Sequence, residues 1–275
     1  MEIKGEEAAY LMGANEPAKS SVLISNSRYL NNPRMRDIYA QMGLKRDSGD
    51  LPGAYLIPEL NRAIAEEMDM PRLYELLAEE KARLPEFAQW LDAGFVSDWN
   101  ACDLSGCAEG TVGATIRRFV EQSGMDIDFM FKDMPKDDFG YLLKRRVQNH
   151  DIEHMVTGLD PTPVGEIALI VANVVAISNY FIPEFAQMLS FQPLFLASTS
   201  LMRMNCHYPK AVPALLEGFA LGYTLGMKQT KPLFMLRWED HIHTAVSDVR
   251  RTLGFEDGPE PGAEHWNWTW DAAKG

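Results

Sequence analysis

A run of seventeen uncharged residues, 167–183, between Glu166 and Glu184, constrains the fold more than any other feature of the sequence. Its length is close to the lower limit of the roughly 17–25 residues that cross a bilayer as a helix. The run nevertheless contains two asparagines and a serine, and it lacks the flanking Lys or Arg anchors of a membrane span. We therefore expect a helix that is buried in the core of the protein.

Apolar residues at helical spacing predict further helices on both sides of this run. Pro85 should break or kink the first of them, and Gly158 and Gly254 are typical residues to end two others. The Gly-, Ser- and Asp-rich stretch 102–113 predicts a loop that opens onto a helix. Because no segment shows convincing β alternation, we predict an all-α fold. The expected helices cover 71–91, 114–121, 139–158, 163–183, 211–227 and 233–253.

The length of 275 residues suits one large domain or two small ones, and we expect a single helical domain. Residues 1–70 are broken by turn-forming residues and predict an irregular and partly helical segment packed on the core. Residues 71–255 form the predicted helical core domain. Residues 256–275 are a Gly-, Pro- and Trp-rich tail that could dock on the body of the protein or on a membrane surface.

The balance of charge argues against nucleic acid as a partner. The chain has 39 acidic residues against 26 Lys and Arg, a formal net charge of −13, which repels phosphate backbones. Three cysteines without a CxxC pair predict neither a disulfide framework nor a cysteine zinc site, and a reducing compartment fits best. Residues 1–7 lack the features of a signal or transit peptide, so we expect a cytoplasmic location.

The string His150-Asp151-Ile152-Glu153-His154 carries most of the chemical information in the sequence. Two histidines four residues apart on a helix lie on one face about one turn apart, so both imidazoles can reach one metal ion. Asp151 is adjacent and can turn a carboxylate oxygen toward the same ion. Because such histidine pairs also occur without a metal, the prediction of a site requires a further ligand.

Glu166 is the candidate for that ligand. If helices 139–158 and 163–183 form an antiparallel hairpin that turns near Asp160, His154 and Glu166 each lie six residues from the turn and stand at the same height. A carboxylate at the head of a long apolar helix is costly to bury unless a cation compensates it. The helix dipole also favours an acid in a first turn, where Glu166 could simply be exposed.

Two imidazoles and two carboxylates suit Zn²⁺, and they also suit Fe²⁺ or Mn²⁺ if the site opens to water or substrate. The same five residues satisfy two other patterns. His150-x-x-Glu153-His154 fits the inverted zinc-peptidase motif, with Glu153 as general base. His150-Asp151 resembles the HD pair of metal-dependent phosphohydrolases, although that interpretation leaves His154 without a role.

A longer pattern resembles the ubiquinone (coenzyme Q) biosynthesis protein 4 family. It reads HDxxHxxxG from His150 to Gly158. Glu166 follows, with eleven residues between it and His154. Upstream, the turn Gly110-Thr111-Val112-Gly113 and Arg145 are similar to the family pattern, and the resemblance covers about residues 100–255. On residues alone, the glycine pair of that turn indicates a tight turn, because no phosphate-binding loop motif surrounds it.

The resemblance implies an all-helical protein with a divalent metal, zinc as first choice, held by His150, Asp151, His154 and Glu166. Family members are needed for ubiquinone biosynthesis, where they are linked to removal of the ring carboxyl group and hydroxylation at that carbon. The implied partners are a polyprenylated quinone precursor or another isoprenoid lipid, other enzymes of the pathway and the inner-membrane surface, to which the protein would attach peripherally. A homodimer is allowed. The alternative is a non-catalytic, lipid-binding scaffold with a structural metal.

From this resemblance we expect a hydrophobic channel for the lipid tail along the helix that begins at Glu166. Methionines would form part of its adaptable lining, among them Met155, Met188, Met202 and Met204. Arg145 could bind the carboxylate of a hydroxybenzoate-type head group, and its alternative role is a surface ion pair. Two positions depart from the family pattern. The family often has a second Arg at the position of Val147, and in this chain the Arg is the preceding residue, Arg146. The Trp-Glu pair expected at 242–243 is replaced by Ile-His, and a Trp-Glu pair occurs one turn earlier, at 238–239.

Two other pairs of residues carry less information. His241 and His243 are two residues apart, which is a poor spacing for a metal pair on a helix, and we expect both at the surface. Cys102 and Cys107 flank a loop, and nothing near them in the sequence predicts a lowered thiol pKa.

Overall fold

The computed structural model describes residues 27–44, 56–96, 104–123 and 133–260. Within these ranges the chain is helical and has no strand, which confirms the all-α prediction. A single isolated β-bridge joins Thr111 to Ala245. The Trp-containing part of the tail and the amino-terminal residues 1–26 lie outside the described residues.

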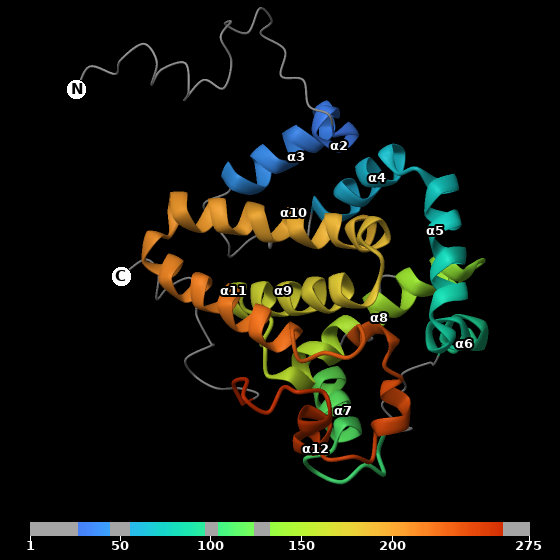
Figure 1. Ribbon diagram of the computed structural model, residues 1–275. Coiled ribbons are helices and arrows are strands. Elements are labelled where there is room, and N and C mark those ends of the chain that lie inside the picture. Colours follow the sequence, from blue (N-terminus) through green and yellow to red (C-terminus); the bar gives the residue numbers. More distant parts are fainter. Residues whose placement is uncertain (1–26, 45–55, 97–103, 124–132, 261–275) are drawn as a thin grey trace, which may run out of the picture.

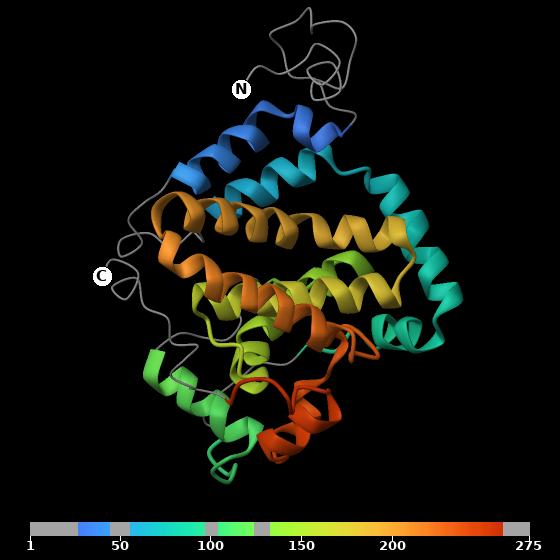
Figure 2. The same cartoon turned by 60° about the vertical axis from the view of Figure 1, so that its left-hand side comes forward.

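Three long helices form the centre of the molecule (Figures 1 and 2). Helix α9 (Pro163–Tyr180) packs against both α10 (Pro183–His207) and α11 (Val212–Gly226). On the other side of α10 lie α3 (Pro33–Leu44) and α4 (Ile57–Glu67). α9 is therefore enclosed between helices, as expected for a core helix. Among the described helices it is the one long and apolar enough to cross a bilayer by composition, and half of it is buried in the protein.

Pro85 divides the predicted amphipathic helix 71–91 into two. α5 (Met70–Arg83) ends before Leu84, and α6 (Pro85–Ala93) begins with the proline, which tolerates the first helical position because its missing N–H is not needed there. Both helices pack with α8 (Asp138–Thr157) through one apolar cluster. The aromatic members of this cluster are Phe87, Phe139, Tyr141, Phe181, Phe185 and Phe234.

A glycine at every fourth position lets α11 lie directly on the backbone of α9. Gly218, Gly222 and Gly226 face this contact. A Cβ atom at Gly218 would come within 3.0 Å of the Val164 carbonyl oxygen, and one at Gly222 would collide with the carbonyl oxygen of Ala168. Side chains at these positions would push the helices apart, so the close packing of α11 on α9 depends on the three glycines.

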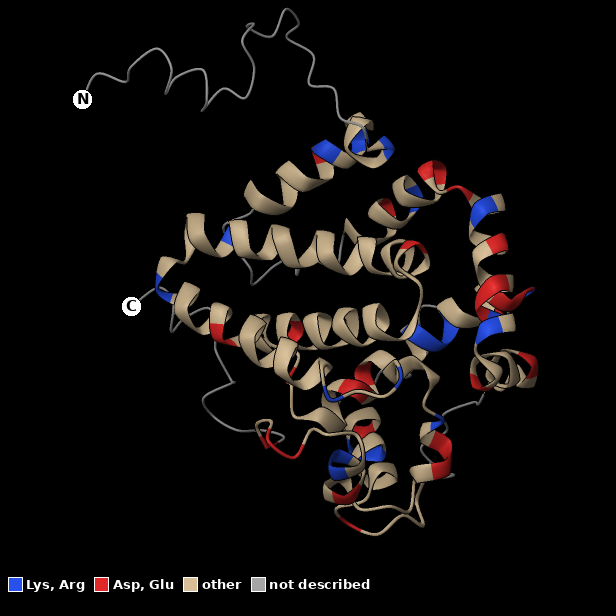
Figure 3. Cartoon of the chain, in the orientation of Figure 1, with Lys and Arg blue, Asp and Glu red and all other residues tan. Residues whose placement is uncertain are grey.

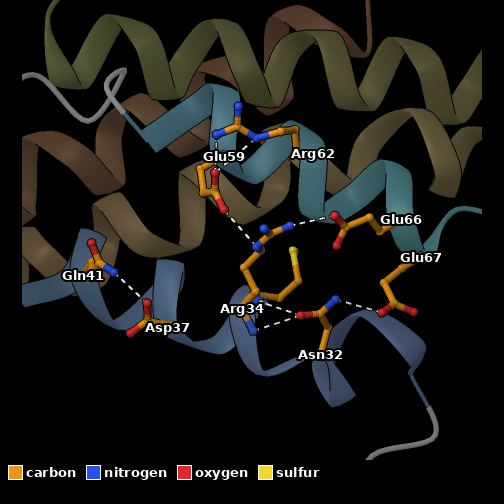
Figure 4. A network of polar contacts seen from close by, with 9 residues as sticks. Asn32, Arg34, Asp37, Gln41, Glu59, Arg62, Glu66 and Glu67 are labelled. Atoms are coloured by element: carbon orange, nitrogen blue, oxygen red, sulfur yellow. Dashed lines mark hydrogen bonds and ion pairs between the residues drawn. The ribbon is translucent and has the colours of Figure 1, made fainter.

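The amino-terminal helices pack on α10 through an apolar cluster, and ion pairs also join α3 to α4. Tyr29 of α2 (Arg28–Asn31), Ile38 of α3 and Leu60 of α4 pack with Phe195 of α10. Figure 4 shows Arg34 joining Glu59 at 2.8 Å and Glu66 at 2.7 Å. Because these ion pairs are exposed, each contributes little stability, and the apolar cluster holds the helices in place.

Charged residues are sparse on the central helices (Figure 3). Glu166 is the one charged residue of α9, and Glu217 is the one charged residue of α11. Most Lys, Arg, Asp and Glu of the described chain lie on the surrounding elements. The carboxylate of Glu166 therefore stands near the amino-terminal end of a helix that has no other charged residue.

The predicted helix 233–253 is wrong. The structure has two short 3₁₀ helices, η3 (Leu233–Met235) and η4 (Trp238–His241), and then α12 (Val246–Thr252), which ends near Gly254 at φ +72°. The intervening residues pair with the start of α7 (Val112–Ser123). Val112 donates its N–H to Thr244 O at 3.0 Å, and Gly113 donates to Ile242 O at 2.9 Å. The first-turn N–H groups of a helix need acceptors, and these carbonyls are available only because their segment is not helical.

The helices predicted at 139–158 and 211–227 agree closely with α8 and α11, and the helix expected from residue 114 begins two residues earlier, at Val112. The run predicted as one helix to residue 183 ends at Tyr180, and α10 begins at Pro183. Helix α10 has no counterpart among the predicted helices. Its interior contains Pro193, and buried residues occur on several of its faces, so it lacks a simple amphipathic pattern.

Candidate metal centre

The end of α8 and the start of α9 bring three predicted ligands together. Gly158, at φ +82°, ends α8, and the Thr162 hydroxyl caps α9 by accepting the N–H of Gly165 at 3.2 Å. His154 Nε2 and Glu166 Oε2 then lie 2.9 Å apart. The turn near Asp160 thus produces the juxtaposition that counting from its centre predicts.

His150, His154 and Glu166 form a triangle of potential ligand atoms that lie within 4.8 Å of one another. Besides the 2.9 Å separation, His150 Nε2 lies 3.3 Å from His154 Nε2 and 3.5 Å from Glu166 Oε2. A tetrahedral ion with bonds of about 2.0–2.2 Å would hold its ligand atoms roughly 3.3–3.6 Å apart. The three side chains fit a divalent ion after a small widening of one edge.

The hydrogen bonding of His154 favours a ligand role for its Nε2 atom. Its Nδ1 atom contacts the backbone carbonyl oxygen of Leu159, which can only accept, so Nδ1 carries the proton. In a neutral ring the lone pair is then on Nε2, which faces the Glu166 carboxylate. Two such electron-rich atoms at 2.9 Å require a cation between them, either a proton or a metal ion. Metal-bound histidines commonly use their second nitrogen in this way.

The electrostatics of the centre also demand positive charge. Burial alone would lower the pKa of His150, but the charge of Glu166 and its hydrogen bond raise it to about 9. Burial alone would raise the pKa of Glu166, but the charge of His150 and the close contacts with both histidines hold it well below its usual range. The carboxylate thus stays ionised and attracts a cation.

Exposure divides the three ligands into an inner and an outer set. The His154 side chain is only 4% exposed, whereas those of His150 and Glu166 are 40% and 38% exposed. A small molecule therefore reaches the centre from the side of His150 and Glu166.

Asp151 is not among the three residues whose ligand atoms cluster. It is partly buried, burial raises the pKa of its carboxyl group, and the charges of His150 and His154 oppose that shift. Asp151 thus lies in the field of the centre, and its role as a fourth ligand stays a prediction.

Glu153 lies on α8 between the two histidines and is 3% exposed. Its Oε2 atom accepts a hydrogen bond from Asn173 Nδ2 of α9 at 2.8 Å. Burial raises the pKa of Glu153, and the charge of His150 opposes that shift. A buried carboxylate held by an amide is poorly placed to activate water, so the geometry does not favour the inverted zinc-peptidase interpretation. The contact joins residues twenty positions apart on two helices, and no sequence pattern predicts it.

Arg145 forms an ion pair, its alternative role, but this pair is buried and not at the surface. Its guanidinium is 1% exposed and donates to Glu239 at 2.9 and 3.3 Å, to Leu236 O at 3.0 Å and to Gln148 Oε1 at 3.0 Å. Trp238, beside Glu239, is fully buried, so the Trp-Glu pair that matters structurally is the one at 238–239. Binding of a substrate carboxylate by Arg145 stays a prediction that would require Glu239 to move.

The Gly110–Gly113 turn serves packing. Gly110 has φ +82°, and a Cβ atom at Gly113 would collide with Cys107 Sγ and approach Ile242 O at 2.8 Å. The turn's N–H groups at residues 112 and 113 donate to backbone carbonyls, so they do not form a phosphate cradle. This agrees with the tight turn expected from the residues.

The other histidines and cysteines of the described ranges lie outside the triangle. His243 is exposed and His241 is half-buried. Cys107 is buried, with its Sγ atom 3.8 Å from His243 Nδ1, and Cys102 lies outside the described residues. Of the predicted channel methionines, Met204 is 2% exposed and packs in the core, whereas Met202 is 47% exposed. The channel stays a prediction.

Gly165→Ala is expected to destabilise the hairpin. Its Cβ atom would overlap the backbone of Asp160, including a distance of 2.8 Å to the Asp160 nitrogen. We expect a loss of about 1–3 kcal/mol in the free energy of unfolding, measured by urea denaturation. The control Gly106→Ala, which meets no atom within 4 Å, should change it by less than about 0.5 kcal/mol. Equal effects of the two substitutions would contradict the close approach.

Comparison with known proteins places these residues in a family. A ubiquinone biosynthesis protein COQ4, mitochondrial, of Scheffersomyces stipitis is 24% identical over 90% of this chain and 77% of its own length. The protein of the same name from Debaryomyces hansenii is 25% identical over 88% of this chain and 73% of its own length.

A crystal structure from Nostoc punctiforme, whose name assigns it provisionally to ubiquinone biosynthesis, shares the fold. It has a TM-score of 0.59 and 23% identity, and the match covers 82% of this chain and 98% of that one. The sequence model of the coenzyme Q (ubiquinone) biosynthesis protein Coq4 family matches residues 96–259, close to the range of the resemblance stated above. The triangle of His150, His154 and Glu166 lies within the match, as do the paired segments around Thr111 and Ala245. The chain belongs to the Coq4 family of ubiquinone biosynthesis proteins.

Proposed function

We propose that this member of the Coq4 family is a metal-dependent enzyme that acts on a prenylated hydroxybenzoate-type precursor of ubiquinone. The proposed reaction removes the ring carboxyl group and places a hydroxyl group on the same carbon. The observation that carries the proposal is the convergence of His150, His154 and Glu166, whose ligand atoms lie within 4.8 Å of one another. The family and the names of its relatives support the pathway.

The proposed metal ligands are His150, His154 and Glu166, with Asp151 as the fourth. Zinc is the first choice, and iron or manganese would suit the same donors. When bound, a divalent ion supplies Lewis acidity toward a substrate oxygen, or, if it is iron, a partner for dioxygen chemistry. The Leu159 carbonyl holds the ring of His154 in one tautomer and one orientation.

The overall reaction requires an oxidant and a reductant. In balanced form, R–COO⁻, O₂, two electrons and three protons give R–OH, CO₂ and H₂O. One oxygen atom of dioxygen enters the ring, the other leaves as water, and an external two-electron donor supplies the electrons. The side of the centre that His150 and Glu166 leave open is where the head group would enter, because both side chains are more than a third exposed.

The lipid tail of the precursor implies a location at a membrane. We propose peripheral attachment to the inner membrane, together with other enzymes of the pathway. The charge-poor surface of α11 supports this proposal, since Leu216 and Tyr223 on the helix and Met227 directly after it are each more than half exposed. A protein of net charge −13 would have to attach through such apolar contacts, because it lacks an excess of basic residues. The relatives' names place those proteins in mitochondria.

Asp151→Ala tests the catalytic proposal. The metal-loaded protein is incubated in air with a prenylated, carboxylated precursor and a reductant, and products are measured by mass spectrometry with ¹⁸O₂. Wild type should form a hydroxylated product with one labelled oxygen. The variant should form about 10- to 100-fold less product while its melting temperature is retained, as expected when a group near the metal is lost.

A non-catalytic scaffold is the second candidate. Four protein ligands would close the centre, and closed sites are usually structural. If Asp151→Ala loses metal and melting temperature together, and wild type leaves the precursor unchanged with zinc and with iron, the scaffold is supported and the enzyme is refuted. The enzyme is favoured because Asp151 stands outside the cluster of the other three ligands, so that a substrate oxygen could take its place on the ion.

A further inference from the structure

Two neighbouring arginines of α8 stand in opposite electrostatic surroundings. Both terminal nitrogens of Arg145 donate hydrogen bonds, to Glu239, to Gln148 and to the Leu236 carbonyl. Arg146 has one hydrogen bond, from Nη1 to Leu189 O of α10 at 3.0 Å. Within the described residues, no carboxylate lies within the 4.0 Å ion-pair distance of Arg146. Its guanidinium therefore has nitrogen donors left for a ligand.

Pro193 explains why the Leu189 carbonyl is available to Arg146. In a regular α-helix the carbonyl of residue 189 would accept the N–H of residue 193, but proline has no N–H. Arg146 supplies the missing donor from the neighbouring helix. One nitrogen of the guanidinium is thereby fixed, which orients the remainder of the group and lowers the entropy cost of binding an anion.

The position of Arg146 relates it to the metal centre. It precedes His150 by four residues on α8, so the two side chains lie on the same face one turn apart. Arg146 is partly buried, and burial lowers its pKa to about 10 although the charge of Glu153 opposes that shift. Glu153 itself is engaged by Asn173. A partly desolvated cation without a paired carboxylate is costly unless a ligand supplies the anion.

We infer that Arg146, and not Arg145, binds the anionic group of the molecule that reaches the His150–His154–Glu166 centre. This inference rests on the proposed function, which makes the anion the ring carboxylate of a prenylated hydroxybenzoate. Arg146 then acts as a specificity residue. It distinguishes precursors that still carry the carboxylate from products that have lost it, and it turns the carboxylated carbon toward the centre.

The test compares two ligands that differ only in the carboxylate. Binding of a short-chain prenylated hydroxybenzoate and of the matching prenylphenol is measured by calorimetry on the full chain. Arg146→Gln should weaken binding of the carboxylate about 10- to 100-fold and leave binding of the phenol within about twofold. Arg146→Lys should recover part of the loss, because it retains the charge. The control Arg62→Gln, on α4, should change neither affinity.

Separate outcomes overturn the inference and the proposed function. If Arg146→Gln weakens both ligands equally, or if wild type binds both equally tightly, Arg146 does not recognise the carboxylate and only the inference fails. If wild type binds neither ligand, the proposed function fails and the inference fails with it. Unchanged melting temperatures of both Arg146 variants would show that a selective loss is not a folding defect.

Discussion

Purified protein is expected to bind one divalent ion per chain, and His154→Ala is expected to lower its affinity for Zn²⁺ at least about 100-fold. The substitution removes the inner ligand of the triangle and also the ring that the Leu159 carbonyl orients. The remaining pair, His150 and Glu166, is 3.5 Å apart and more than a third exposed, so solvent competes for the ion. Competition with a chromophoric chelator and elemental analysis measure the effect.

His241→Ala is the matched control, because His241 lies outside the triangle. It should retain the affinity and the stoichiometry of wild type. A further check is thermal. Zn²⁺ in excess should raise the melting temperature of wild type and of His241→Ala, and this rise should be lost in His154→Ala, since only a ligand bound by the folded state stabilises it. Wild-type protein without metal affinity, or equal affinities of wild type and His154→Ala, would refute the metal centre.

Arg145→Leu is expected to lower the free energy of unfolding by about 3–5 kcal/mol, the usual cost of leaving one member of a buried ion pair without its partner. Glu239 would keep its charge at a site where its side chain is 12% exposed, and the Leu236 carbonyl would lose its donor. Urea denaturation measures the change. The double variant Arg145→Leu/Glu239→Leu should recover part of the loss, because it removes both members of the buried pair.

The control for this prediction is Arg251→Leu. Arg251 pairs with Asp248 on α12, but the two side chains are 68% and 56% exposed, and the expected loss is below about 1 kcal/mol. Similar losses for Arg145→Leu and Arg251→Leu would mean that the buried pair does not hold α8 to η4.

The sequence was informative where structure is local. Gly158, Pro161 and Pro163 define the turn between α8 and α9, and counting from Asp160 is then enough to bring Glu166 to His154. Helical spacing likewise located most of the long helices, because their apolar faces repeat within a few residues. The resemblance over about residues 100–255 was confirmed, because the Coq4 family matches residues 96–259.

The sequence was misleading where partners are distant. No pattern within 233–253 shows that the carbonyls of Ile242 and Thr244 are needed by the first turn of α7. Arg145 and Arg146 are adjacent in sequence, yet one faces Glu239 and the other faces a carbonyl that Pro193 leaves without a helical donor. Spacing predicted which residues share a face of α8, but the fate of each charge depends on other elements.

The pairing of Thr111 with Ala245 also has a kinetic consequence. The two segments lie near the opposite ends of the family match at 96–259, so their contact spans most of its length. During synthesis α7 leaves the ribosome long before the residues that complete its first turn. Contacts of such high sequence separation form late and slow the folding of a domain. We therefore expect that the pairing of the segment around Ala245 with the first turn of α7 is the last step of folding.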